Sequence, residues 1–449
     1  MSETTILKSK RLTIKVKFAP SKSPDIASNI HEYVKLEIRR ESGEVDVYEQ
    51  DPEGVAKLKN KPFTLGKTLT EFALQEKRSF YKSLLQKYGE IENLVILSGA
   101  GSSVDIGVEN KGLTMAGLWD SLAEEQTSSL ITLIKESKYH EVDESNQIVN
   151  PESLVKDLES LLSISSITNF VLKKKELTDA IKITRQFIAK KCTIQLPDNS
   201  PHLHLINKIL LRPQKFPRVK IFTLNYDTLF EQAAAKEKYT VIDGFTFSAP
   251  RLFNGKYFDY DIIETRHNRQ DKRDSNIAKL FYLFKMHGSL NWKRNKSEIE
   301  QFDNEIDIED RVMIFPQDSK YEHSYEQPYF EMMARFQQTL RTDNTLLITI
   351  GFSFIDKHIS SVILESIKQN SSLNLLAFTF PSIVDGSETA KSYQKELHRI
   401  SEMQSRVTLV AETFENLANE YPENIAHKRF DLLEDLNESL KKIVHDEEK

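Results

Sequence analysis

Polar residues that can hold a sugar or move a proton directly follow two apolar runs of the chain. Asn225 and Asp227 come just after VKIFTL at 219–224, and His287 comes soon after LFYLF at 280–284. In an open α/β sheet the ligand crevice lies beyond the carboxyl ends of the strands, so these positions suit chemistry. Taken singly, Asn225 or Asp227 is explained as a cap of the following helix, and an isolated histidine is more often structural than catalytic.

A glycine-rich turn, GAGSS at 99–103, follows another apolar run. The chain has only 14 glycines in 449 residues, and five of them fall between Gly99 and Gly117. A strand, a glycine turn and a helix N-terminus present N–H groups that suit a diphosphate, while a tight turn without a ligand is the alternative. Val104 occupies the place where a dehydrogenase fingerprint needs Gly or Ala, which disfavours a hydride-transferring site.

A third turn follows LLITI at 346–350. Gly351 and Ser353 end this run, and Asp356 is expected to cap the next helix. His358 lies in the first turn of that helix and is interpreted as structural. The single Cys192 excludes a multi-cysteine zinc site, and the other ligand types show no recognisable metal spacing, so we expect no metal.

The apolar runs also indicate the fold class. They read as strands buried on both faces, and several precede helical patterns, which predicts an α/β, Rossmann-like, doubly wound and mostly parallel sheet. The expected core strands are 94–97, 219–224, 280–284, 311–315, 346–350, 375–380 and 406–411.

The chain divides into three parts, and the middle part contains these strands and carries an insertion. Residues 1–65 alternate polar and apolar residues and predict a small N-terminal β unit. A helix is expected near 68–88, at the start of a core domain over 66–411. The glycine-free stretch 118–218 has helical periodicity and predicts a large insertion, and 412–449 is expected to form charged C-terminal helices.

Composition limits the possible partners. The chain carries 61 Lys and Arg against 67 Asp and Glu, a formal charge of −6, which argues against direct sequence-specific binding of nucleic acid. No signal peptide is evident, and the apolar runs are far shorter than the ~20 residues that span a bilayer. One cysteine fits a reducing compartment. We therefore expect a cytoplasmic protein without a membrane partner.

Four motifs in fixed order resemble the sirtuin-type NAD-binding fold: GAGSS (99–103), TLNYD (223–227), KMHGS (285–289) and GFSFIDKHI (351–359). The resemblance implies NAD as a substrate, with Asn225, Asp227 and His287 as the catalytic residues. It further implies that NAD is bound by Gly99, Ala100, Gly101, Ser102, Gly288, Gly351 and Ser353.

The chain departs from the protein-deacylase branch of that family. It lacks the four-cysteine zinc ribbon and the Pro-Asp-Phe-Arg element, and reads GVENKGLTMAGLW at 107–119 instead. Thr114 and Trp119 are candidates for covering the nicotinamide. The pattern is similar to bacterial sirtuin-like proteins of anti-phage defence, including subunits that assemble with a HerA-type ATPase and, more distantly, the Thoeris effector.

The resemblance implies hydrolysis of NAD to nicotinamide and ADP-ribose, with an anti-phage defence role and a HerA-type ATPase or other defence-system partner. A homo-oligomer is expected from the N-terminal β unit, whose exposed strand edges can pair between subunits. A non-catalytic subunit that binds NAD or ADP-ribose and regulates an ATPase complex is an alternative. Protein deacylation is another alternative, which the missing cysteines disfavour.

Overall fold

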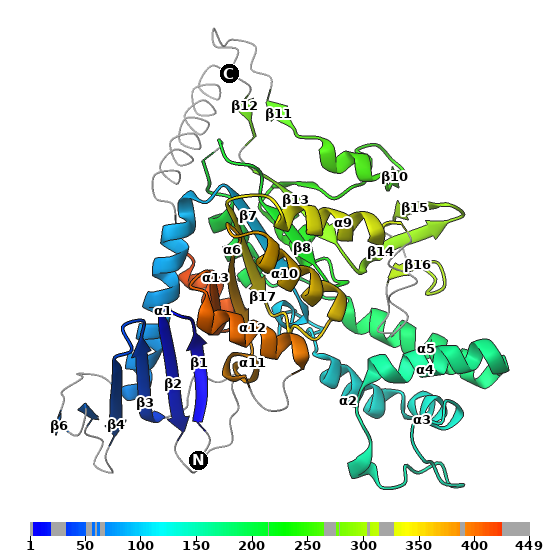
Figure 1. Cartoon of the computed structure of the whole chain (residues 1–449). Coiled ribbons are helices and arrows are strands. Elements are labelled where there is room, and N and C mark those ends of the chain that lie inside the picture. The colour runs from blue at the N-terminus through cyan, green and yellow to red at the C-terminus, as the bar shows by residue number, and fades with distance from the viewer. Residues whose placement is uncertain are drawn as a thin grey trace, which may run out of the picture.

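The computed structural model describes residues 3–18, 33–50, 56–58, 61–62, 68–213, 215–264, 275–277, 279–302, 306–313, 327–386 and 391–423 (Figure 1). Seven parallel strands form the core of the main sheet in the order β19-β18-β17-β7-β8-β13-β9. Their bounds are β7 (Asn93–Ser98), β8 (Lys220–Thr223), β9 (Thr240–Ile242), β13 (Leu280–Lys285), β17 (Thr345–Ile350), β18 (Asn374–Thr379) and β19 (Val407–Ala411).

The order of these strands reverses at β7. From β7 the chain moves to the β8 side of the sheet, and after β13 it returns to β17 on the other side of β7. This is a topological switch point, where the loops after the two neighbouring strands diverge and leave room for a ligand. The expected doubly wound, mostly parallel α/β fold is thus confirmed.

The N-terminal strands extend the same sheet. Strand β1 pairs antiparallel with β19, so the antiparallel strands continue the core sheet at one edge. The antiparallel strands are β1 (Glu3–Lys8), β2 (Leu12–Phe18), β3 (Tyr33–Arg40), β4 (Val45–Gln50), β5 (Ala56–Leu58) and β6 (Lys61–Pro62). Alternating polar and apolar residues at 11–18, 33–39 and 44–49 predict β2, β3 and β4, but no such pattern predicts β1, the strand that joins the two parts.

One expected core strand lies elsewhere. The run at 311–315 supplies β16 (Arg311–Met313), which belongs to a separate antiparallel sheet in the order β10-β15-β14-β16. Two of its three side chains are buried, so its apolar pattern alone does not distinguish this sheet from the core. The remaining strands of this sheet are β10 (Arg251–Leu252), β14 (Gly288–Asn295) and β15 (Glu298–Gln301); β11 (Ile263–Glu264) pairs with β12 (Ser275–Asn276).

Helices pack around the main sheet. Helix α1 begins after a capping box in which Thr68 accepts from the Glu71 N–H and Glu71 accepts from the Thr68 N–H. The helices outside the insertion are α1 (Leu69–Lys87), α7 (Leu229–Lys236), α9 (Tyr329–Leu340), α10 (Lys357–Gln369), α11 (Pro381–Asp385), α12 (Ser392–Met403) and α13 (Phe414–Glu420). Residues 424–449, where further C-terminal helix is expected, lie outside the described residues. No helix in the described ranges is long and apolar enough to cross a membrane.

Helices α2 to α6 lie between β7 and β8. Most of them pack around a second hydrophobic core, distinct from that of the sheet, which contains Trp119, Leu161 and Phe187. Their bounds are α2 (Met115–Glu125), α3 (Thr127–Glu136), α4 (Leu158–Leu172), α5 (Lys175–Cys192) and α6 (Pro201–Ile209). In Figure 1 α4 and α5 project away from the sheet.

A buried histidine predicts how stability depends on pH. The ring of His202, on α6, lies 4.9 Å from the ring centroids of Phe230 and Phe414, and burial lowers its pKa to about 3. The unfolded chain binds a proton near pH 6.5, so stability from the neutral ring is present above that pH and is lost as pH falls toward 3. Lowering the pH from 7.5 to 5 should cost about 2 kcal/mol through this residue.

The free energy of urea unfolding should be measured at pH 7.5 and at pH 5. We expect His202→Phe to lose less stability between these two pH values than wild type, because it lacks the buried imidazole. His204→Gln changes a half-buried histidine of the same helix, bonded to Asn419, and is the matched control. An equal loss in wild type and His202→Phe would contradict the assignment.

Candidate functional site

The four motifs meet at one edge of the sheet because their strands end in register. Ile350 of β17 pairs with Ser98 of β7, Ser98 pairs with Thr223 of β8, and Thr223 pairs with Lys285 of β13. Neighbouring strands lie about 4.8 Å apart, so the four following loops start in a row about 14 Å long. The sequence prediction that these motifs share one edge agrees with this geometry.

The glycine loop after β7 packs directly on Gly351. The Gly101 N–H donates to the Gly351 carbonyl oxygen at 2.9 Å, and Gly351 has a φ of 60°. A Cβ on Gly101 would lie 2.7 Å from the Gly351 Cα, and a Cβ on Gly99 would lie 2.8 Å from the Gly351 oxygen. Only glycine allows the two backbones to approach this closely at the switch point.

The helix expected after this loop is a single 3-10 turn, Ala100–Ser102, and the next α-helix begins at Met115. The loop amides are used within the protein: Ser102 N–H donates to Gly99 O and Ser103 N–H to Ala100 O, each at 3.0 Å. The expectation of an α-helix N-terminus facing a diphosphate is therefore wrong. Ala100 is the exposed residue of this turn.

Asn225 fastens the loop after β8 to the glycine loop. Its Nδ2 lies 3.0 Å from Gly99 O, 3.1 Å from Ser102 Oγ and 2.8 Å from Ser103 Oγ. Because the amide nitrogen carries two hydrogens, these three oxygens occupy its donor capacity.

Asp227 is also tied to the glycine loop, through Ser103. The Ser103 hydroxyl donates to Asp227 Oδ2 at 2.7 Å, and Asp227 Oδ1 accepts from the Leu229 N–H at 3.1 Å at the start of α7. Asp227 is only 7% exposed. One side chain thus contacts both the glycine loop and the first backbone N–H of α7, whose N-cap residue is Thr228.

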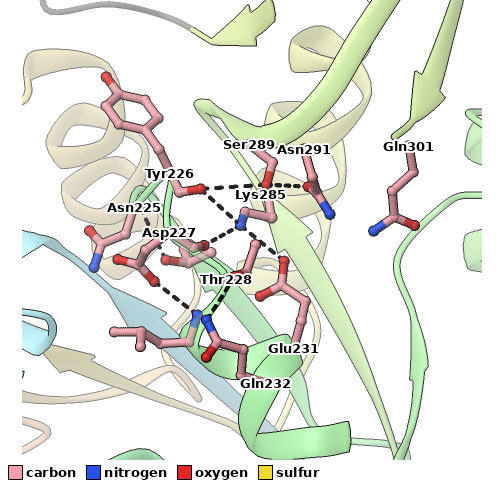
Figure 2. A network of polar contacts seen from close by, with 12 residues as sticks. Asn225, Tyr226, Asp227, Thr228, Glu231, Gln232, Lys285, Ser289, Asn291 and Gln301 are labelled. Carbon is pink, nitrogen blue, oxygen red and sulfur yellow. Dashed lines mark hydrogen bonds and ion pairs between the residues drawn. The ribbon is translucent and has the colours of Figure 1, made fainter. Parts of the chain in front are cut away.

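Lys285 lies beneath the Asn225–Asp227 turn and is missing from the residues expected from sequence. Figure 2 shows its ammonium group among the carbonyl oxygens of Tyr226 and Asp227 and the Glu231 carboxylate, whose Oε1 lies 3.0 Å from Nζ. Lys285 is 2% exposed. Burial raises the pKa of Glu231, and the lysine charge opposes that rise. A charged residue at the end of an apolar strand is the signal that points to it.

His287 pairs with Asp356 across the site. Its Nε2 lies 3.6 Å from Asp356 Oδ2, although their strands, β13 and β17, are separated by β8 and β7. The two side chains are 14% and 11% exposed. Asp356 Oδ1 also accepts from the His358 and Ile359 N–H groups, so the expected cap of α10 is confirmed. His358 supplies a backbone amide to this cap.

Other expected site residues have different surroundings. Gly288 has a φ of 84°, and a Cβ there would lie 2.1 Å from Val312 O, so this glycine makes the turn into β14. The Ser353 carbonyl oxygen accepts from Gln394 Nε2 at 2.7 Å. Ser102 is 1% exposed and its hydroxyl lies 2.6 Å from Ser98 Oγ, inside the loop.

The two candidates for covering a nicotinamide have structural roles. Trp119 is 2% exposed in the core of the insertion, and Thr114 caps α2 by accepting from the Gly117 N–H at 3.1 Å. Trp119 therefore has no surface to offer a ligand. Across the described part of the chain, no group of three or more His, Cys, Asp or Glu residues could hold a metal ion.

In a comparison with known families, residues 219–400 match the SIR2-like domain. The matched segment runs from just before β8 into α12 and contains Asn225, Asp227, His287 and Gly351, while GAGSS precedes it. No curated protein matches the chain. This part of the chain is sirtuin-like, and the similarity indicates an NAD-related function.

The buried lysine supports a stability prediction. Lys285→Met should lower the free energy of urea unfolding by about 3–5 kcal/mol, because it leaves the Glu231 carboxylate and two carbonyl oxygens without their cation. Adding Glu231→Gln should recover part of the loss by removing the uncompensated charge. A loss below about 1 kcal/mol, or a double variant no more stable than Lys285→Met, would contradict this role for the lysine.

Proposed function

We propose that this protein hydrolyses NAD to nicotinamide and ADP-ribose. The observation that carries the proposal is the joining of three strand-end loops at the switch point, by Asn225 and by the Gly101–Gly351 contact, with His287 and Asp356 paired across the same edge. The similarity of residues 219–400 to the SIR2-like domain supports NAD as the ligand. An open α/β sheet binds ligands at this place.

The chemistry requires little from the protein. The C1′–N bond of the nicotinamide ribose breaks, and its electron pair goes to the ring nitrogen, so nicotinamide leaves neutral. Water forms the new C1′–O bond and loses one proton. The protein must stabilise an oxocarbenium-like ribose and position the water.

We assign roles from the contacts. The Asn225 nitrogen is occupied by the glycine loop, so its Oδ1 is the atom proposed to accept from a ribose hydroxyl or the water. Asp227 holds this turn through Ser103, and His287 accepts the proton of the water or of a ribose hydroxyl. Gly99, Ala100 and Gly101 lie along the diphosphate, with Gly351 and Ser353 toward the adenosine half and Ser102 and Gly288 shaping the loops.

The wider role is part of the same proposal. The protein acts in the cytoplasm as a defence effector that depletes NAD, as a homo-oligomer and together with a HerA-type ATPase or other defence partner. The proposed division is an N-terminal unit over 1–65, a catalytic domain over 66–411 with its insertion at 118–218, and C-terminal helices over 412–449. The support is the motif pattern and the single cysteine.

Nicotinamide release tests the activity. Purified protein, with and without its partner, is incubated with NAD, and nicotinamide and ADP-ribose are followed by chromatography. Asn225→Ala and His287→Ala should each lower turnover by at least about 100-fold, because each removes a group that acts in the transition state. His204→Gln, on a helix apart from the site, is the control. NAD binding without release in any condition would favour the non-catalytic subunit.

Asp356 offers a sharper test of the histidine. Asp356→Asn keeps a good helix cap but removes the charge facing His287 Nε2, so kcat should fall about tenfold while the melting temperature changes little. Asp157→Asn is the matched control, because Asp157 caps α4 with the same pair of backbone contacts. Unchanged kcat in Asp356→Asn would rule out a positioning role for Asp356.

A further inference from the structure

Three successive carbonyl groups of the loop after β17, residues 351–356, are held by other parts of the molecule. Each accepts one hydrogen bond: Gly351 O from the Gly101 N–H at 2.9 Å, Phe352 O from the Thr379 hydroxyl at 2.9 Å and Ser353 O from Gln394 Nε2 at 2.7 Å. The donors come from the glycine loop, the last residue of β18 and helix α12. The backbone of this loop is therefore fixed by three separate elements.

Gln394 is a buried side chain with both ends of its amide in use. It is 7% exposed, and its Oε1 accepts from the Lys391 N–H at 2.8 Å. Because the oxygen end is occupied there, the NH₂ end faces the Ser353 carbonyl. Thr379 is 4% exposed, and its hydroxyl has a single hydrogen, which it donates to the loop. Both buried side chains thus direct a donor at the loop.

The same loop contains a strained residue. Phe354 has a φ of 57°, in the left-handed region that bulky residues rarely adopt, and it is 1% exposed. Its ring packs on that of Phe352, with 4.7 Å between the ring centroids. Such strain persists only where surrounding contacts impose it, and it clusters at functional sites. The contacts that hold the carbonyl groups are the ones that can maintain it here.

Fixing the carbonyl groups also orients the amide N–H groups of the loop. A peptide unit is planar and trans, so each N–H points away from the carbonyl of the residue before it. The N–H groups of Phe352, Ser353 and Phe354 donate to no acceptor within the residues that the structure describes. Ser353 is half-buried, and its hydroxyl has no partner among those residues either. The loop thus carries donors at the switch point that the described protein does not use.

We propose that Gln394 is a positioning residue for the binding of NAD, and that Thr379 acts with it. Neither side chain belongs to the candidate site, but together they keep the Ser353 donors directed at the ligand. The inference rests on the proposed function, in which Gly351 and Ser353 lie toward the adenosine half of NAD. The part of the ligand concerned is the adenosine diphosphate group, which NAD and ADP-ribose share.

This positioning role concerns ligand binding and not the chemical step. Asp356, at the end of the same loop, is held by its own contacts with the His358 and Ile359 N–H groups of α10. Its pairing with His287 therefore does not depend on Gln394. An interaction that is equally strong in the ground state and the transition state contributes to KM and leaves kcat unchanged.

The kinetics of nicotinamide release test the role of Gln394. Gln394→Glu keeps an oxygen for the Lys391 N–H, but an ionised carboxylate has no hydrogen for the Ser353 carbonyl. It should raise KM for NAD about tenfold and change kcat less than about twofold. Gln404→Glu makes the same change at the other end of α12, where the side chain only accepts from Arg406, and is the matched control. Equal KM values in Gln394→Glu and wild type would overturn the role.

A second pair of variants tests the hydroxyl of Thr379. Thr379→Val has nearly the same shape but no donor for the Phe352 carbonyl, so it should also raise KM. Thr379→Ser keeps the hydroxyl and should restore KM toward the wild-type value. Melting temperatures show that each variant is folded. Equal KM values in the valine and serine variants would contradict the part assigned to this hydroxyl.

Binding of ADP-ribose, measured by isothermal titration calorimetry, separates this inference from the proposed function, because it requires no hydrolysis. If wild type binds ADP-ribose without releasing nicotinamide from NAD, the hydrolysis is wrong, and weaker binding by Gln394→Glu still supports the positioning role. If wild type hydrolyses NAD and Gln394→Glu binds ADP-ribose equally well, the positioning role is wrong and the function stands. Absence of both hydrolysis and binding in wild type would overturn both.

Discussion

The contact between Gly101 and Gly351 is the constraint on which the rest of the site depends. It joins the loops after β7 and β17 at the point where the strand order reverses, with backbone atoms closer than a side chain would permit. Once this contact fixes the glycine loop, Gly99 O and the hydroxyls of Ser102 and Ser103 converge on Asn225 Nδ2. Three loops that start on three strands are thereby held as one unit.

Charged side chains also hold the loops of the site together. Two carbonyl oxygens of the Asn225–Asp227 turn point to one buried ammonium group, Lys285, whose charge is balanced by Glu231. A buried cation of this kind costs desolvation energy, and its contacts with the turn and with Glu231 offset that cost, so the lysine holds the polar turn in place. The pairing of His287 with Asp356 adds a fourth loop, since it connects the ends of β13 and β17 above the two strands between them.

The edge of the sheet that carries the site can be predicted from the sequence, because parallel strands buried on both faces appear as apolar runs. Apolar runs ended by polar or glycine residues correctly predicted the ends of β7, β8, β13 and β17, and hence the shared edge. The run at 311–315 was wrongly assigned to that sheet, because burial in a small antiparallel sheet gives the same pattern. Lys285 and Asp356 were not recognised as site residues, because their partners lie more than 50 residues away in sequence. The prediction of a helix directly after GAGSS is wrong, because small residues permit a 3-10 turn as readily as the start of a helix.

The insertion and the site share a packed boundary. Tyr226, between Asn225 and Asp227, and Leu290, just beyond His287, both pack against the second core, which also contains Met313 of β16. Burial raises the pKa of Tyr226 well above its usual value, so its phenol remains neutral in that position. Since close-packed interiors transmit strain, a change in the insertion core would act on the turn that carries Asn225 and on the start of β14. The helical insertion is thus a structural support of the candidate site.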